Sequence, residues 1–317
     1  MEIFRMENKP LGFSYLFIQI SFFFLWFSMS SQRRNLHVLL IELKSRFNIL
    51  KTNIRRKRIL LLGITIFICI LPMLFALLYT YLAYVENKED YFWSLELALQ
   101  NKKQKILVMI IGEYMYFTVS LEYPCLFALS VCTLVHHYGL LILYINNELT
   151  KRNLTTDPKK LRRIISDFIC LEKKISLLKD SLSTSLFIIL LICFCNLFTV
   201  LSSCLEEEIT SFLALELCSN GFTGVAVIFS LTTCCSKIPD YILRTKMAAK
   251  ALIDKYVLNE FDYGKTVNLL KIIVEKDAIY LSAGDIVYFK KSFLLSAFGT
   301  LFTYGLLIMN FKKDSES

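Results

Sequence analysis

Charged residues are scarce in this 317-residue chain: Asp, Glu, Lys and Arg make up 20% of it, whereas hydrophobic residues make up 55%. Its mean hydropathy is +0.52, far above that of soluble globular proteins. The few charges are grouped into blocks, which leaves long apolar stretches between them. These features exclude a soluble globular domain and indicate a membrane protein.

The sequence also lacks the motifs on which common catalytic sites are built. It contains no GxSxG, P-loop or HExxH motif, and ten glycines leave no Gly-rich segment to hold a phosphate. Adjacent His136 and His137 point about 100° apart on a helix, so they cannot bind one metal ion as an i, i+4 pair would. We therefore predict that the chain is not an enzyme and holds neither a cofactor nor a metal.

Cysteine is present, with ten residues, but without the spacing of a disulfide framework or a zinc site. Most of the ten lie inside apolar runs, as Cys193 and Cys195 do. We interpret them as small buried apolar side chains.

Long apolar segments account for about half of the sequence, and each is long enough to cross a bilayer as a helix. We predict an all-α polytopic membrane helical bundle with cytoplasmic helical extensions. Its six expected spans cover about 10–32, 59–85, 113–146, 181–205, 211–236 and 290–311.

The distribution of Lys and Arg predicts how these spans cross the membrane. Segments 31–58 and 148–180 carry nine basic residues each and segment 237–291 carries ten, whereas segment 206–216 carries none. Basic connections face the cytoplasm. The alternation requires a single crossing between Lys105 and Glu148, which we expect to be one long helix kinked at Pro124. The net charge of +9 then reflects these loops and not nucleic-acid binding.

The same alternation places both chain ends outside; the alternative is that a further span precedes the first one and returns the N-terminus to the cytoplasm. Between the last two spans, apolar residues recur at helical spacing over Thr266 to Tyr280, with Lys271, Glu275 and Lys276 on the other side. This pattern predicts an amphipathic cytoplasmic helix over 266–280.

Two acids within the long apolar helix are candidates for a ligand cavity. Acidic side chains in an apolar helix face the protein interior or water by default, which applies to Glu113 and Glu122. Tyr116 and Tyr123 are near them in sequence, and aromatic hydroxyls with an acid suit a small amphipathic or cationic ligand. Two alternatives remain open: the helix extends outward beyond the membrane at the acids, and the tyrosines form an aromatic interface belt.

The last predicted span has a sparsely polar face. Thr303, then Leu306 or Leu307, then Asn310 recur at i, i+3 or i+4, and i+7. In a symmetric oligomer such a face can line a narrow pore, in which leucines gate by excluding water. An ordinary packed helix explains the periodicity as well.

The end of this span resembles the C-terminal signature of the insect and arthropod gustatory receptor family. The signature consists of Thr-Tyr, five mostly hydrophobic residues and Gln-Phe. Thr303, Tyr304 and Phe311 stand at the expected spacing, and Asn310 replaces the glutamine. By topology the resemblance extends over most of the chain.

The resemblance implies a seven-span receptor of the plasma membrane, of which this chain supplies spans two to seven. It further implies a ligand-gated, non-selective cation channel assembled as a homo- or hetero-tetramer in the lipid bilayer. The last helix of each subunit would surround the pore, and each bundle would bind a small-molecule tastant. A polytopic solute transporter and a truncated, non-conducting receptor product are the alternative hypotheses.

Overall fold

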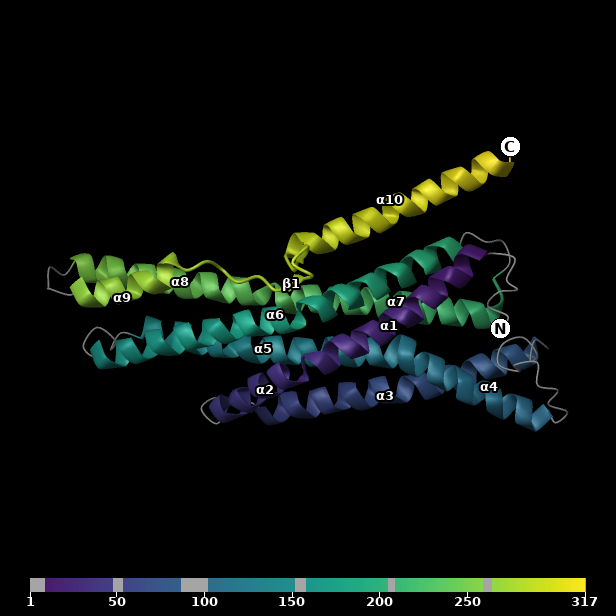
Figure 1. Cartoon of the computed structure of the whole chain (residues 1–317), viewed down its shortest axis with the longest axis horizontal. Coiled ribbons are helices and arrows are strands. Elements are labelled where there is room, and N and C mark those ends of the chain that lie inside the picture. Colours follow the sequence, from purple (N-terminus) through teal and green to yellow (C-terminus); the bar gives the residue numbers. More distant parts are fainter. Residues whose placement is uncertain are drawn as a thin grey trace.

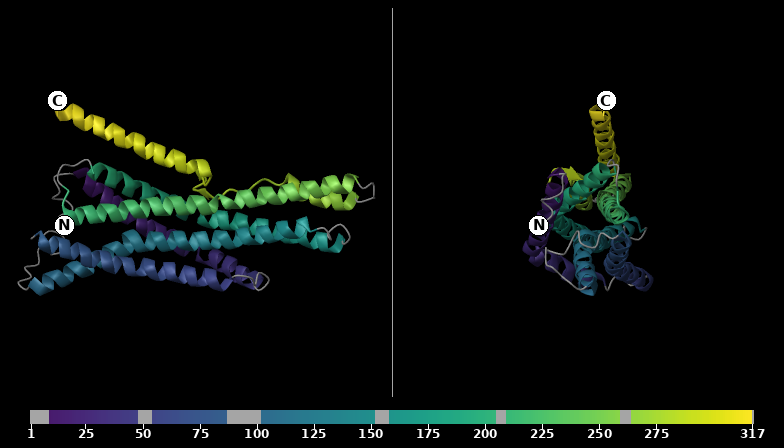
Figure 2. Two further views of the ribbon diagram at one scale, coloured as in Figure 1. Left: turned by 180° about the vertical axis from the view of Figure 1, so that it is seen from behind. Right: turned by 90° about the vertical axis from the view of Figure 1, so that its right-hand side faces the viewer.

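The computed structural model describes residues 9–47, 54–86, 102–151, 158–204, 209–258 and 264–316, and almost all of them are helical. The helices run lengthwise beside one another in an elongated bundle (Figures 1 and 2). In chain order the elements are α1 (Lys9–Ser31), α2 (Arg33–Phe47), α3 (Ile54–Val85), α4 (Lys102–Phe117), η2 (Thr118–Glu122), α5 (Tyr123–Thr150), α6 (Pro158–Ser203), α7 (Ser211–Cys235), α8 (Lys237–Leu258), α9 (Gly264–Glu275), β1 (Ser282–Ala283), β2 (Val287–Tyr288) and α10 (Lys291–Glu316).

One continuous helix occupies the segment for which we predicted a single crossing. α4, η2 and α5 follow one another without a break from Lys102 to Thr150. η2 is a π-helical turn, in which the N–H of Tyr123 donates to the carbonyl oxygen of Thr118. Pro124 follows at once, and its ring would clash with the carbonyl four residues before it in a regular helix. The widened turn accommodates this proline.

The ends of the helices fall into two groups. The C-terminal ends of α2, α5 and α8 and the N-terminal ends of α3, α6 and α9 lie toward one end of the molecule, which we call the basic end (Figure 1). The C-terminal ends of α3 and α6 and the N-terminal ends of α4 and α7 lie toward the opposite end, with the N-terminal end of α1 and the C-terminal end of α10 (Figure 1). This arrangement agrees with the alternation of Lys and Arg along the chain.

Four helices of the described part are long and apolar enough to cross a membrane, which is the pattern of a multi-pass membrane protein. They cover Arg58–Val85, Lys102–Thr150, Lys159–Ser203 and Ser211–Val257, and Leu16–Ser31 is a shorter apolar helix. The count of six spans therefore stays a prediction, and residue 205 of the expected fourth span lies outside the described residues.

The amphipathic helix predicted over 266–280 is shorter in the structure, where α9 ends at Glu275. An extended segment and a short antiparallel hairpin of β1 and β2 follow, with Ser282 opposite Tyr288. Gly284 (φ 61°) and Asp285 (φ 55°) both adopt left-handed conformations at the hairpin turn. Two consecutive residues of this kind are incompatible with a continuing helix.

The bundle has two hydrophobic clusters. The larger one joins α1, α2, α5, α6, α7, α8, α9 and the hairpin along the length of the molecule. The smaller one joins α3, α4 and α7 toward the end opposite the basic end, with Tyr79 and Phe117 at its centre. There the Glu86 carboxylate accepts a hydrogen bond of 3.0 Å from the backbone N–H of Ser211. A carboxylate at a helix N-terminus is favourable and ties α3 to α7.

We expect the three basic connections to be cytoplasmic. Epitope tags inserted at Arg56, Lys160 and Lys265 should be protected from antibody in intact cells and become accessible after permeabilisation, while a tag after Ser317 should be accessible throughout. Basic loops resist translocation, which is the physical reason. Labelling of the Lys160 tag in intact cells would contradict the topology.

Candidate functional site

A polar network crosses the apolar bundle between α4 and α7. The Tyr116 hydroxyl donates to Oε1 of Glu216 at 2.6 Å, and Nδ2 of Asn220 donates to the Tyr116 hydroxyl oxygen at 3.0 Å. Glu216 and Asn220 are 7% and 4% exposed. A short hydrogen bond to a carboxyl group is among the stronger ones, and it fixes the Tyr116 ring against α7.

Further buried polar side chains extend this network along α4 and α7. Glu113 is buried one turn before Tyr116, while Ser219 and Thr223 share a face of α7 with Glu216 and Asn220 at i, i+3, i+4 and i+7. We call these six residues the outer polar cluster: Glu113, Tyr116, Glu216, Ser219, Asn220 and Thr223.

Several polar atoms of the outer polar cluster have unused hydrogen-bonding capacity. In the described part of the chain, Oδ1 of Asn220 and the hydroxyl oxygens of Ser219 and Thr223 have no hydrogen-bond partner. Each such buried atom is unfavourable by about 1–3 kcal/mol. Two hydroxyls of η2 share this state, those of Thr118 and Ser120. A polar molecule that donates hydrogen bonds would satisfy these acceptors.

An aromatic group adjoins the outer polar cluster. The Phe117 ring lies 5.5 Å from Phe75 and 5.4 Å from Tyr116, and Tyr79 lies 5.4 Å from Phe212, all measured between ring centroids. The Phe117–Tyr116 and Tyr79–Phe212 contacts are edge-to-face, whereas Phe75 is tilted against Phe117, and ring contacts of these kinds hold their partners in place. The combination of aromatic rings with acids and hydroxyls suits a small ligand that has an apolar body and polar groups.

The four residues expected from the sequence to face a ligand have different neighbours. Glu113 and Tyr116 both belong to the outer polar cluster. Glu122 is half-buried and lies near the Cys69 thiol of α3. The Tyr123 ring packs edge-on against Phe22 of α1, with 6.3 Å between centroids. The π turn follows the first pair and ends at Glu122, the first residue of the second pair.

Glu216 and Asn220 were missed by the sequence analysis. Glu216 lies within the expected span 211–236, and α7 begins at Ser211, but this acid was not singled out as a candidate. The spacing of four residues between an acid and an amide, followed by Thr223, was the available signal for a polar helix face.

The pore-lining candidates lie on α10, which leaves the bundle at an angle (Figures 1 and 2). Gly305 is buried against Leu201 of α6, whereas Thr303, Tyr304, Leu306 and Leu307 are exposed. Leu306 and Leu307 are 47% and 48% exposed. Asn310 and Phe311 belong to α10, but their side chains lie outside the described residues.

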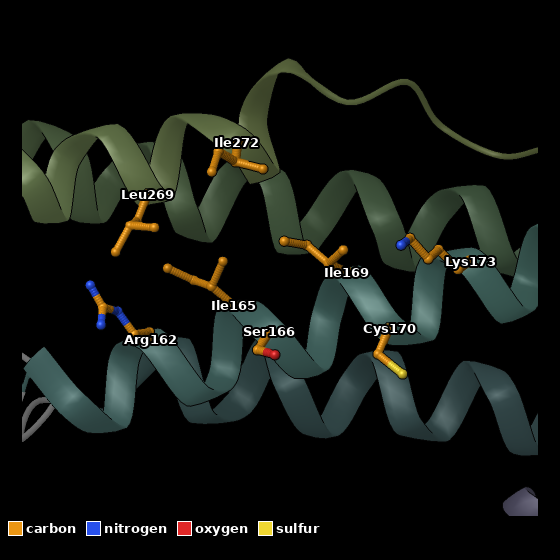
Figure 3. A pocket seen from close by; sticks show the side chains of 8 residues that line it. All are labelled: Arg162, Ile165, Ser166, Ile169, Cys170, Lys173, Leu269 and Ile272. Carbon is orange, nitrogen blue, oxygen red and sulfur yellow. The ribbon is translucent and has the colours of Figure 1, made fainter.

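Two pockets lie away from the outer polar cluster. One, of about 370 Å³, lies between α6 and α9 near the basic end, with Arg162 and Lys173 beside aliphatic side chains (Figure 3). The other, of about 440 Å³, lies between α1, α6 and α10 and is lined by Phe17, Phe194, Phe198 and Tyr304 among others.

The hairpin that precedes α10 is attached to α6. Lys179 and Asp285 form an ion pair of 3.0 Å, and the N–H of Gly284 donates to the carbonyl oxygen of Ser183 at 2.9 Å. The Ser282 hydroxyl and Lys179 lower the pKa of Asp285 below its ordinary value. The start of α10 is also held by an ion pair of 2.9 Å between Lys291 and Asp240 of α8.

Comparison with known proteins yields structural matches only. No family model matches the chain, and no curated protein matches its sequence. The insect olfactory receptor OR5 from Machilis hrabei in complex with eugenol is similar, with a TM-score of 0.64 and 12% identity, covering 97% of this chain and 84% of that chain. The same receptor in a second structure gives a TM-score of 0.65 and 13% identity, covering 96% and 81%.

With sequence identities this low, the TM-scores establish similarity of fold alone. The long apolar segments predicted an all-α polytopic bundle, and the C-terminal motif resembled that of a related receptor family; the predicted fold class is confirmed. The chain therefore has the fold of the insect olfactory receptors.

Proposed function

We propose that the chain is a subunit of a ligand-gated cation channel that detects small molecules, of the gustatory receptor type suggested by Thr303, Tyr304 and Phe311. The observation that carries the proposal is the outer polar cluster, a buried set of hydrogen-bonding groups within an apolar bundle. Similarity to an olfactory receptor whose structure contains eugenol supports it. The protein acts at the plasma membrane as a receptor and not as an enzyme.

In this proposal the ligand binds at the outer polar cluster. The cluster has two carboxyl groups and several hydroxyl and amide acceptors, so it favours molecules rich in hydrogen-bond donors, such as small amines and hydroxylated compounds. The aromatic group beside it accommodates an apolar body. Glu122 and Tyr123 lie about two turns further along the same helix and are secondary candidates for contact with the ligand.

The proposed pore is formed by the exposed face of α10 in a tetramer. Ser296, Gly299 and Thr303 recur at helical spacing on this face, and all three are exposed in the single chain. Leu306 and Leu307 continue the face toward the C-terminal end. Four copies of such a face would give a narrow pore with small polar residues along it and leucines at a constriction.

Replacing Tyr116 by phenylalanine tests the ligand site. The substitution keeps the ring but removes the hydroxyl that joins Glu216 and Asn220. Losing hydrogen bonds of this kind changes binding by about 1–2 kcal/mol, so we expect the half-maximal ligand concentration to shift about tenfold. The measurement is whole-cell current in cells that express the chain, over a panel of small amines and hydroxylated compounds.

Tyr114→Phe is the matched control, because Tyr114 lies two residues away on α4 and is 40% exposed. Its dose-response curve should coincide with that of the parent. Identical shifts in both variants would rule out a specific role of the outer polar cluster. A panel that evokes no current in the surface-expressed parent would count against the channel itself.

A further inference from the structure

A continuous exposed stripe runs along α1 and α2 and changes from aromatic to basic. Trp26 and Phe27 of α1 are 57% and 61% exposed. Arg33, Arg34 and Lys44 of α2 are exposed as well. The stripe therefore passes from large aromatic rings to cations within a short distance.

The register of the helix carries across the junction between α1 and α2. The N–H of Gln32 donates to the carbonyl oxygen of Ser28 at 3.2 Å, and the N–H of Leu36 donates to that of Gln32 at 3.0 Å. With 3.6 residues per turn, Trp26, Arg33 and Lys44 lie within about 20° of one face. Arg33 lies about 10 Å beyond Trp26 along the axis, a separation that fits an interfacial aromatic ring and a lipid phosphate.

The opposite face of α2 is fixed to the bundle, so the basic face has a defined orientation. Leu39 and Leu43 are buried in the larger hydrophobic cluster, and the Tyr138 hydroxyl of α5 donates to the carbonyl oxygen of Leu39 at 3.3 Å. Glu42 is the acid of α2, and it forms an ion pair with Lys174 of α6. Its negative charge is thus directed toward the bundle and away from the cations.

We propose that this face of α2 binds the headgroups of anionic phospholipids in the leaflet at the basic end. The phosphate-binding groups are Arg33, Arg34 and Lys44, with His37 on the same face. Val38, Leu40 and Ile41 are each more than half exposed beside them, an arrangement typical of a helix at a bilayer surface and unfavourable in water. Charge complementarity selects the occupant, since basic clusters next to a spanning helix attract anionic lipids.

The test uses the fluorescence of Trp26 in the full chain, reconstituted into vesicles. The chain has two tryptophans, so Trp93→Phe leaves Trp26 as the reporter. Phosphatidylserine with brominated acyl chains, diluted into phosphatidylcholine, is compared with brominated phosphatidylcholine at the same fraction. We expect the anionic lipid to quench Trp26 with roughly fivefold or greater preference, because one cation near an anionic surface contributes about that factor.

Arg33→Gln combined with Arg34→Gln should reduce the preference to about one, whereas Arg33→Lys with Arg34→Lys should retain it. Arg162→Gln with Arg163→Gln is the matched control, an exposed arginine pair near the N-terminal end of α6 that should leave the preference unchanged. Lys44→Gln provides a milder change if the double variant does not fold. Raising the salt concentration should weaken the preference.

Equal quenching by the two brominated lipids in the parent would overturn the proposal, as would an undiminished preference in both glutamine variants on α2. In either case the cations of α2 would face solvent or an acidic protein surface. The test does not depend on channel activity, so it stands apart from the proposed function.

Discussion

Leu307→Ser is expected to raise the resting cation current at least tenfold in the absence of ligand. In the proposed tetramer, four leucines form a constriction that water and ions do not enter, and four serines would let both pass. A change of only about 1.4 kcal/mol in the balance between closed and open states is a factor of ten. Leu306→Ser should have a similar effect, because both leucines are about half exposed on α10.

The measurement is resting current in cells, normalised to receptor at the surface. Leu301→Ser is the matched control, because Leu301 lines the pocket between α1, α6 and α10 on the other side of the helix. This variant should reach the surface without a leak. If Leu306→Ser and Leu307→Ser both reach the surface with current at background, α10 does not line the gate.

Gly224→Ala is expected to lower the melting temperature of the purified protein by roughly 4 °C. A Cβ atom at position 224 would lie 2.9 Å from Cγ of Leu197 and 3.2 Å from the carbonyl oxygen of Cys193, both on α6. The carbonyl belongs to a buried helix and cannot move aside, so α6 and α7 must separate slightly. Overpacking of this kind is unfavourable by about 1–3 kcal/mol, which corresponds to a few degrees.

Gly63→Ala is the control, for which we expect no decrease in the melting temperature. A Cβ atom there meets nothing within 4 Å, so the replacement should hold or raise the melting temperature through higher helix propensity. Thermal unfolding in detergent, followed by light scattering, measures both variants. A Gly224→Ala protein as stable as the parent would mean that α6 and α7 are less closely packed than in the structure.

Charge and hydropathy made the course of the longest helices predictable. Basic loops required a single crossing between Lys105 and Glu148, and the structure has one unbroken helix there. The π turn was not predictable from hydropathy. A hydropathy pattern does not distinguish the i to i−4 hydrogen bonds of an α-helix from the i to i−5 hydrogen bonds of a π-helix. Pro124 indicated only that the helix must deviate nearby.

The hairpin before α10 was missed because apolar residues continue at helical spacing past the end of α9. Ile279 and Leu281 fit the helical pattern, yet both pack onto the larger cluster from an extended segment. The adjacent Gly284 and Asp285 were the local sign of a turn. Their effect depends on tertiary contacts, since the turn is fixed by Lys179 and Ser183 of α6.

Only the α4 residues of the candidate ligand site were predicted from the sequence. An acid and a tyrosine within an apolar run indicated Glu113 and Tyr116, because burying polar groups requires partners. The identity of those partners depends on which helices are neighbours, and the contact of α4 with α7 joins residues 100 positions apart. Periodicity identified the exposed face of α10 but not what it faces, which is a matter of assembly.

The π turn at Thr118–Glu122 has a consequence for evolutionary comparison. Its hydrogen bond joins residues five positions apart, whereas those of a regular α-helix join residues four apart, so the turn contains one extra residue. Loss of that residue would rotate one half of the helix by about 100° relative to the other. Aligned against a relative with a regular helix, the chain requires a one-residue gap at this turn. Without the gap, the residues on one side of the turn would be misaligned by one position, which is about 100° around the helix. A single-codon insertion or deletion here is thus a route by which such receptors could exchange the residues presented to a ligand.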